Sequence, residues 1–198
     1  MKIDSAGLPF IIIFAILSPF TTIFAVFMLY FFRDPERKVP QEDGIVVAPA
    51  DGKVIVASDV EEIKYFNETR PQVSIFMNLF NVHVNRAPVD GNVVMVKHNK
   101  GKFMAAFKED ASFQNENTEM VIENGHGKTL VRQVAGLIAR RTVCRAAPGD
   151  KLRHGERFGI IKFSSRVDTV LPEGYRITVK PGDKVRAGET IIARLQTI

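Results

Sequence analysis

The sequence has 198 residues, of which 45% are hydrophobic and 25% are charged, with 14 Gly and 10 Pro. This composition excludes a disordered or collagen-like chain and suits one domain, or one domain with an appendage. A single cysteine, Cys144, excludes an intramolecular disulfide and a multi-cysteine zinc site. The formal net charge of +5 favours an anionic partner, either nucleic acid or anionic lipid.

The first predicted element is an apolar segment over residues 8–32, which carries no charged side chain and seven of the fifteen Phe residues. As one helix it would extend about 37 Å, against roughly 30 Å of bilayer hydrocarbon. We therefore expect a transmembrane or membrane-embedded helix with a kink at Pro19. A re-entrant hairpin and a buried core helix are the alternatives. Because Arg33, Arg37 and Lys38 follow the segment, the positive-inside rule places the rest of the chain on the cytoplasmic side.

Residues 41–198 read as a β-rich domain, and residues 1–40 as a membrane anchor with a basic juxtamembrane linker. Short β-branched and apolar runs alternate with Gly, Pro, Asn and Asp, and helical periodicity is weak. The favoured architecture is a β barrel or sandwich, whose core should not need residues 1–32. The expected strands include residues 45–47, 54–56, 73–76, 93–96, 120–122, 130–134, 159–163, 176–179 and 190–194.

An internal repeat supports the β architecture. PGDKLRHGE at residues 148–156 recurs 33 residues later as PGDKVRAGE at residues 181–189, with seven of nine positions identical. Pro and Gly favour a turn, and Asp can bond to the turn backbone. The hairpin resembles the turns of biotinyl/lipoyl-type β domains, and residues 48–54 resemble the hairpin that opens such a fold. No lysine occupies a carrier-type turn, so an attached biotin or lipoate is not expected.

Among the four histidines, His83 is the leading candidate for chemistry because it lies in a polar-interleaved run directly after an apolar strand. A structural role for it is equally consistent with the local sequence. The other three, His98, His126 and His154, read as loop or turn residues. The second candidate is the Ser-Ser pair at residues 164–165, although two serines at a strand end are usually only a turn. A hydroxyl needs a base to become a good nucleophile, and a carboxylate such as Asp51 can orient a histidine for that purpose.

Taken together, these sites make the chain resemble the short, pyruvoyl-dependent form of phosphatidylserine decarboxylase found in bacteria and archaea. The resemblance runs nearly end to end. It is carried by FFRDPER at residues 31–37, APADG at 48–52, FMNLFNVHVNR at 76–86, NEN at 115–117, and GERFGIIKFSSRVD at 155–168.

This resemblance implies a proenzyme that cuts itself between Ser164 and Ser165. Ser165 would attack the preceding carbonyl, and an N-to-O acyl shift, elimination and hydrolysis would convert it to a pyruvoyl group. Chains 1–164 and 165–198 would then remain as partners. His83, oriented by Asp51, is the expected base for cleavage. In turnover the amine of phosphatidylserine would form a Schiff base with the pyruvoyl carbonyl, CO2 would leave, and His83 would reprotonate the carbon to give phosphatidylethanolamine.

Two positions depart from the family pattern. The family normally has Gly-Ser at the cut, and serine resists strained backbone angles that glycine accepts, so Ser164 could slow processing. Longer members have a second histidine where this chain has Arg86, which we expect to bind the lipid phosphate. The expected location is the inner cell membrane with the catalytic domain on the cytoplasmic side, facing anionic lipid. A homodimer is compatible with the sequence.

The competing class is a membrane-anchored, lipoyl-like adaptor module without enzymatic activity. The turn repeat and the apolar anchor alone suit that function. It leaves Asp51, His83 and Ser165 without a role, and the long coiled-coil hairpin of such adaptors is missing from the sequence. A nucleic-acid partner has no supporting motif. The positive charge is better explained by anionic lipid, at about 1 kcal/mol per basic residue near the surface.

Overall fold

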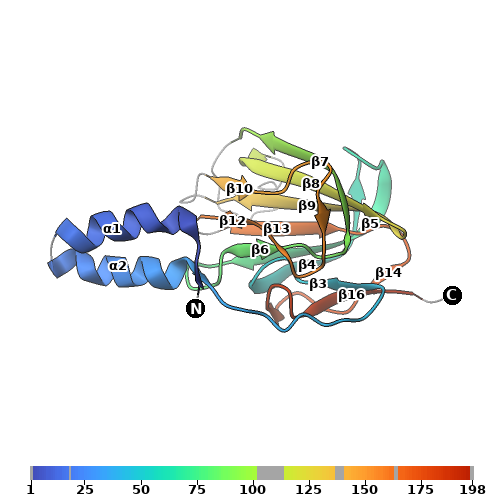
Figure 1. The fold of residues 1–198 in the computed structure, drawn as a ribbon. Coiled ribbons are helices and arrows are strands. Elements are labelled where there is room, and N and C mark those ends of the chain that lie inside the picture. Colours follow the sequence, from blue (N-terminus) through green and yellow to red (C-terminus); the bar gives the residue numbers. More distant parts are fainter. Residues whose placement is uncertain (1, 18, 102–113, 137–140, 163–164, 197–198) are drawn as a thin grey trace.

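The fold is taken from a computed structural model, which describes residues 2–17, 19–101, 114–136, 141–162 and 165–196. Two helices form a hairpin that projects from one end of a β-rich body (Figure 1). The first elements are β1 (Lys2–Ile3), η1 (Ser5–Gly7), α1 (Leu8–Leu17), α2 (Pro19–Phe31) and β2 (Arg33–Asp34). The remaining strands are β3 (Ile45–Val47), β4 (Gly52–Glu62), β5 (Glu68–Met77), β6 (Val84–Arg86), β7 (Gly91–Asn99), β8 (Asn117–Asn124), β9 (Gly127–Ala135), β10 (Thr142–Cys144), β11 (Lys151–Leu152), β12 (Arg157–Ile161), β13 (Ser165–Val170), β14 (Tyr175–Ile177), β15 (Lys184–Val185) and β16 (Ile191–Leu195).

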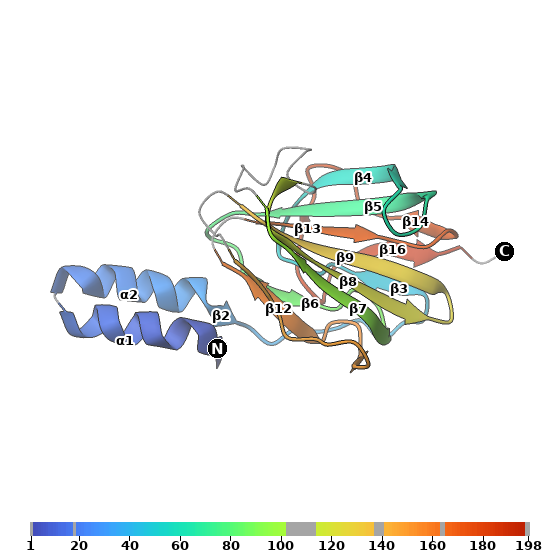
Figure 2. The same ribbon diagram turned by 90° about the horizontal axis from the view of Figure 1, so that it is seen from above.

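The expectation of a mostly β body is confirmed. The described strands of this body form an eight-stranded antiparallel sheet in the order β11-β7-β8-β9-β13-β5-β4-β15, and two three-stranded sheets, β10-β12-β6 and β14-β16-β3. The large sheet curves, and the two small sheets lie against it (Figure 2). The main core fills the space between them, with buried side chains from β5, β8 and β13 meeting those of β3, β12 and β16. Strand β13, which begins at Ser165, lies in the interior of the large sheet between β9 and β5.

The prediction of one continuous helix over residues 8–32 is wrong. Helix α1 ends at Leu17 and α2 begins at Pro19, and the two helices lie side by side (Figures 1 and 2). Proline suits the first position of a helix because its fixed φ fits there and its missing N–H has no partner to lose. The segment therefore has the hairpin shape that was the alternative to a single helix. Within the described ranges, neither helix has the length and apolar character needed to cross a bilayer.

The inner end of the hairpin belongs to the hydrophobic core, which corrects the expectation that the β body does not need residues 1–32. Phe31 and Phe32 are buried and pack with Val82, Val84 and Ile160. Burying a phenylalanine side chain contributes about 1.5–3 kcal/mol. Strand β1 also pairs with β2. Deleting residues 1–32 would therefore open a cluster that includes residues of β6 and β12.

The two turn repeats occupy equivalent places at opposite edges of the large sheet. The first repeat forms edge strand β11 against β7, and the second forms edge strand β15 against β4. Gly149 donates its N–H to the Val93 carbonyl at 2.8 Å, and Gly182 donates to the Val54 carbonyl at 2.9 Å. Both glycines have φ near +100°, a region that favours glycine, which explains why the turns keep it. The two copies of the repeat therefore supply the two short edge strands of the large sheet.

Candidate active site

Ser165 is the first residue of β13, and its backbone is paired on both sides, with Met77 of β5 and Ala135 of β9. Its side chain is fully buried. The Oγ atom has no hydrogen-bond partner within the described part of the chain. An unsatisfied buried hydroxyl costs about 1–3 kcal/mol, so such a group calls for a functional explanation. Ser164, the other residue of the expected cut, lies outside the described residues.

His83 is fully buried just before β6, in the loop that follows β5. Its Nδ1 lies 3.0 Å from the carbonyl oxygen of Asn81. A carbonyl oxygen only accepts, so Nδ1 carries the proton and Nε2 presents a free lone pair. Like Ser165 Oγ, Nε2 is buried with no described partner. Burial lowers the pKa of His83 to about 4, opposed by the Asn81 carbonyl and assisted by the positive charge of Arg33. The imidazole is therefore neutral near pH 7 and has the form of a general base.

The fold brings the loop of His83 and the start of β13 to the same part of the molecule. Ile161, four residues before Ser165, donates its N–H to the His83 carbonyl at 3.3 Å, and β12 pairs with β6 through Ile160 and Val84. Strands β6 and β12 lie at the end of the β body that carries the helical hairpin (Figure 1). These contacts place two buried, unpartnered polar groups of complementary chemistry in one region.

Two buried amide side chains near this region were not predicted from the sequence. Gln133 of β9 donates from Nε2 to Asn85 Oδ1 at 2.8 Å. Its Oε1 is a further buried atom without a described partner. Gln133 lies opposite Val167 in the β9–β13 register, two residues along from Ser165. Asn85 lies in the polar-interleaved run that also contains His83, which was the one available signal, whereas Gln133 had none.

Asp51 binds other partners than His83, so the expectation that its carboxylate orients the imidazole is wrong. Its carboxylate accepts two hydrogen bonds of 2.9 Å from the Arg37 guanidinium and one of 2.8 Å from the Ala187 N–H in the second repeat. Asp90 occupies the matching place in the first repeat, because it accepts from the His154 N–H at 2.7 Å. Each aspartate comes from an Ala-Pro-x-Asp-Gly sequence before a long strand. The shared geometry gives Asp51 a part in holding the repeat turn.

We expect Asp51→Asn to lower the free energy of unfolding by about 1–3 kcal/mol, because it weakens the ion pair of a buried Arg37. Urea unfolding of the uncut Ser165→Ala chain, with and without Asp51→Asn, would measure this change. Asp90→Asn is the matched control. Its carboxylate is 60% exposed, so the loss should stay below about 1 kcal/mol. Unchanged stability together with a shifted pH dependence of chain cleavage would instead restore Asp51 as a partner of His83.

Arg86 is committed to structural contacts, which contradicts its expected role in binding a lipid phosphate. The side chain is 5% exposed. Its guanidinium donates to the Gly155 carbonyl at 2.9 Å, to Asp34 Oδ1 at 3.1 Å and to the Pro35 carbonyl at 3.1 Å. These bonds fasten the segment after the hairpin to the first repeat. A phosphate would have to displace buried partners to reach Arg86.

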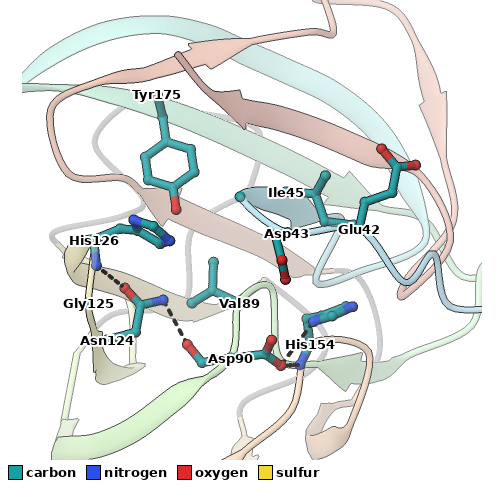
Figure 3. A pocket seen from close by; sticks show the side chains of 11 residues that line it. Glu42, Asp43, Ile45, Val89, Asp90, Asn124, Gly125, His126, His154 and Tyr175 are labelled. Atoms are coloured by element: carbon teal, nitrogen blue, oxygen red, sulfur yellow. Dashed lines mark hydrogen bonds and ion pairs between the residues drawn. The ribbon is translucent and has the colours of Figure 1, made fainter. Parts of the chain in front are cut away.

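A cavity of about 340 Å³ lies elsewhere and is lined by His126, His154, Tyr175 and the acidic residues Glu42, Asp43 and Asp90 (Figure 3). His154 Nδ1 lies 2.9 Å from Asp90 Oδ1, and its Nε2 lies 2.8 Å from the Pro40 carbonyl. His154 therefore braces the linker against the first repeat, as the expected turn residue would. Neither Ser165 nor His83 lines this cavity.

The family model described as phosphatidylserine decarboxylase matches residues 24–193. The chain belongs to the phosphatidylserine decarboxylase family. A phosphatidylserine decarboxylase proenzyme of Chlorobium chlorochromatii is 51% identical over 176 residues, covering 88% of this chain and 82% of the relative. Proenzymes of the same name from Symbiobacterium thermophilum and Geobacter metallireducens are 47% and 46% identical, covering 86% and 92% of this chain and 80% and 84% of the relatives.

Family membership bears out the resemblance drawn from the sequence motifs. The matched region includes the last part of α2, both turn repeats, His83 and Ser165. It therefore covers all of the groups from which the candidate site is built.

Proposed function

We propose that this chain is a self-processing, pyruvoyl-dependent decarboxylase that converts phosphatidylserine to phosphatidylethanolamine and CO2. The proposal is supported by two buried groups that have no hydrogen-bond partner among the described residues, Ser165 Oγ and His83 Nε2, within a member of this family. A nucleophile and a neutral base kept from other hydrogen bonds are what a single internal acyl transfer requires. The adaptor alternative gives neither residue a role.

Self-cleavage follows from the tautomer of His83. Nε2 accepts the hydroxyl proton as Ser165 Oγ attacks the carbonyl carbon of residue 164, and the amide bond between residues 164 and 165 is exchanged for an ester. Loss of the Cα proton of residue 165 then expels the carboxylate of residue 164, which becomes the new end of the large chain. Addition of water to the resulting dehydroalanine and loss of ammonia leave the pyruvoyl group on residue 165. His83 is neutral above about pH 4, so it can act as base at physiological pH.

The residues around Ser165 fit a pyruvoyl group at this position. Conversion of Ser165 removes its buried hydroxyl, which has no described partner, and leaves a methyl carbon in its place, while Gln133 Oε1 and His83 Nε2 are buried acceptors that could take hydrogen bonds from the substrate amine. When present, the pyruvoyl carbonyl supplies an electrophile that binds the substrate amine and takes up electrons as CO2 leaves. The protein's own contribution is then to exclude water and to let His83 Nε2, which is unprotonated at rest, take a proton from the substrate ammonium and return it to the substrate carbon.

The intact mass of the purified protein, paired with CO2 release from phosphatidylserine, tests this function. We expect fragments 1–164 and 165–198, the smaller one blocked at its amino terminus and resistant to Edman degradation. A single full-length mass with no CO2 release would overturn the proposal. Slow conversion to the two fragments would instead direct attention to Ser164 at the cut.

The helical hairpin supports a location at the cytoplasmic face of the cell membrane, where phosphatidylserine would be met in the bilayer. Large apolar side chains are exposed along both helices, among them Leu8, Phe10, Ile12, Ile13, Ile23, Phe24, Val26 and Tyr30. An apolar patch of this extent marks an interaction surface rather than a solvated one. Basic Arg33 follows the hairpin, and Lys162 lies with its Nζ 5.7 Å from the Phe10 ring, so cationic groups flank the apolar surface.

We expect Ile23→Asp combined with Val26→Asp to reduce decarboxylation of phosphatidylserine in vesicles at least about tenfold, because each charge opposes insertion by about 2.5–3.5 kcal/mol at full depth. Chain cleavage should be unaffected, since both side chains point away from the core, with 79% and 58% of their surface exposed. Ile63→Asp is the control, because Ile63 is 72% exposed on the β4–β5 hairpin. Vesicle sedimentation and CO2 release would be measured together. Equal loss in both variants would rule out a specific lipid surface on the helices.

A further inference from the structure

The loop that carries His83 is fastened to the inner end of helix α2. The Phe80 carbonyl accepts hydrogen bonds from Tyr30 Oη at 3.1 Å and from Arg33 Nη2 at 2.7 Å. Arg33 is itself fixed, because Nη1 donates to the Tyr30 carbonyl at 2.7 Å and the guanidinium lies 3.7 Å above the Tyr30 ring. The side chains of Tyr30 in α2 and of Arg33, two residues after α2, therefore hold one backbone oxygen of the His83 loop. Phe80 itself is 65% exposed beside the hairpin and extends its apolar surface.

The last residue of α2 contacts the base directly. The Phe31 ring stacks on the His83 imidazole, with centroids 4.0 Å apart and 30° between the ring planes. Both side chains are fully buried. The Nδ1–H bond to Asn81 fixes one edge of the imidazole, but it leaves rotation about that bond free. Stacking on a flat ring removes this rotation and fixes where Nε2 points.

We propose that Phe31 is a positioning residue for His83, so that the apolar hairpin forms part of the active site as well as a lipid-binding surface. The proposal rests on the proposed function, in which His83 is the base for chain cleavage. The hairpin then has a second role, because Phe31 orients the imidazole of His83 as Asp51 was expected to do. Cleavage should then depend on the ring of Phe31 even in the absence of membrane.

The Phe31 ring also shields the imidazole from water, since it stacks on it and both side chains are fully buried. Of the charged groups on the elements packed around His83, Arg33 follows α2 and lowers the pKa of His83, and Lys162 follows β12. The loop over residues 78–82 carries no titratable side chain. Replacing the ring by a smaller side chain admits water, so the pKa of His83 should rise toward its ordinary value of about 6.5. A general loss of packing elsewhere would not move this value.

The experiment compares Phe31→Leu with Phe32→Leu. Phe32 is the matched control because it is buried in the same cluster and packs on Phe31 and Gly7, while the stacking contact with His83 belongs to Phe31. Each chain is made by brief cell-free translation and shifted to a series of pH values, and cleavage is followed on gels. In parallel, the imidazole of His83 is titrated by NMR in uncut Ser165→Ala chains that carry the same substitutions. Both readouts report on His83 without requiring lipid or turnover.

For Phe31→Leu we expect cleavage about 10- to 100-fold slower on the pH plateau, since a displacement near 1 Å can cost about 10²-fold. Its pH midpoint should rise by at least about one unit above that of the parent. Phe32→Leu should keep the parent midpoint. The proposal is overturned if the two variants behave alike, or if Phe31→Leu slows cleavage while the His83 titration is unchanged. A parent chain that never cleaves would refute the proposed function instead.

Discussion

Ser165→Ala should give a single uncut chain that releases no CO2 from phosphatidylserine. The substitution removes the attacking oxygen, and without the ester and its elimination no pyruvoyl group can form, so cleavage and activity are lost together. Folding should not suffer, because the Oγ atom is buried without a described partner and its removal deletes an unsatisfied polar group. Intact mass, CO2 release and thermal unfolding of the purified variant would measure cleavage, activity and stability.

Thr169 provides a matched control on the same strand. Its hydroxyl is also buried without a described partner, and it lies four residues after Ser165 on β13. Thr169→Val removes that hydroxyl and keeps the shape of the side chain, so its cleavage and activity should equal those of the parent. A blocked small fragment from the Ser165→Ala chain would show that the pyruvoyl precursor is a residue other than Ser165.

His83→Ala should slow chain cleavage by about 10²–10⁴-fold, the usual contribution of a general base. The fraction that does mature should show a similar reduction in CO2 release per cleaved molecule, because the same nitrogen would protonate the product carbon in every turnover. A gel time course paired with CO2 release normalised to the cleaved fraction separates the two duties. His126→Ala, in an exposed turn, is the control. Normal turnover by matured His83→Ala protein would remove His83 from decarboxylation, and normal cleavage as well would leave it a structural histidine.

The pH dependence of the parent chain has a definite sign. The neutral imidazole is the active form, and the folded-state pKa of His83 is lowered to about 4. Cleavage should therefore be nearly independent of pH above about 5 and should fall as the pH drops through 4. In the unfolded chain His83 binds a proton below about pH 6.5, whereas in the folded chain it does so only below about pH 4. The free energy of unfolding should therefore decrease as the pH falls from about 6.5 to 4. His83→Ala should lack this contribution to acid sensitivity.

The β class, the repeat turns and the family could be predicted because short stretches of contiguous sequence indicate each of them. The hairpin was harder, since an apolar run of this length is equally compatible with one helix and with two, and only packing of Phe31 and Phe32 against Val82 and Ile160 shows where its inner end belongs. Periodicity within 8–32 carries no information about contacts with residues fifty or more positions away.

The partners of charged residues could not be predicted for the same reason. Asp51 binds Arg37 and the backbone of Ala187, and Arg86 binds Asp34 and Gly155. Each of these contacts depends on how the two repeats close the edges of the sheet. The duplication of Ala-Pro-x-Asp-Gly before Asp51 and Asp90 was visible in the sequence. This duplication indicates a shared turn-holding role for Asp51 and Asp90, whereas the analogy with catalytic triads predicts an orienting role for Asp51.

The position of β13 between β9 and β5 has a consequence for the proposed cleavage into two chains. The segment after Ser165 supplies β13 to the middle of the large sheet, β15 to its edge, and β14 and β16 to a separate sheet with β3. The two proposed products of cleavage would therefore be interwoven, and neither could leave without unfolding the other. Unfolding would become a dissociation whose midpoint rises with protein concentration. Refolding would require two separate chains to meet, so maturation commits each molecule to a structure that it reaches only once, as a single polypeptide.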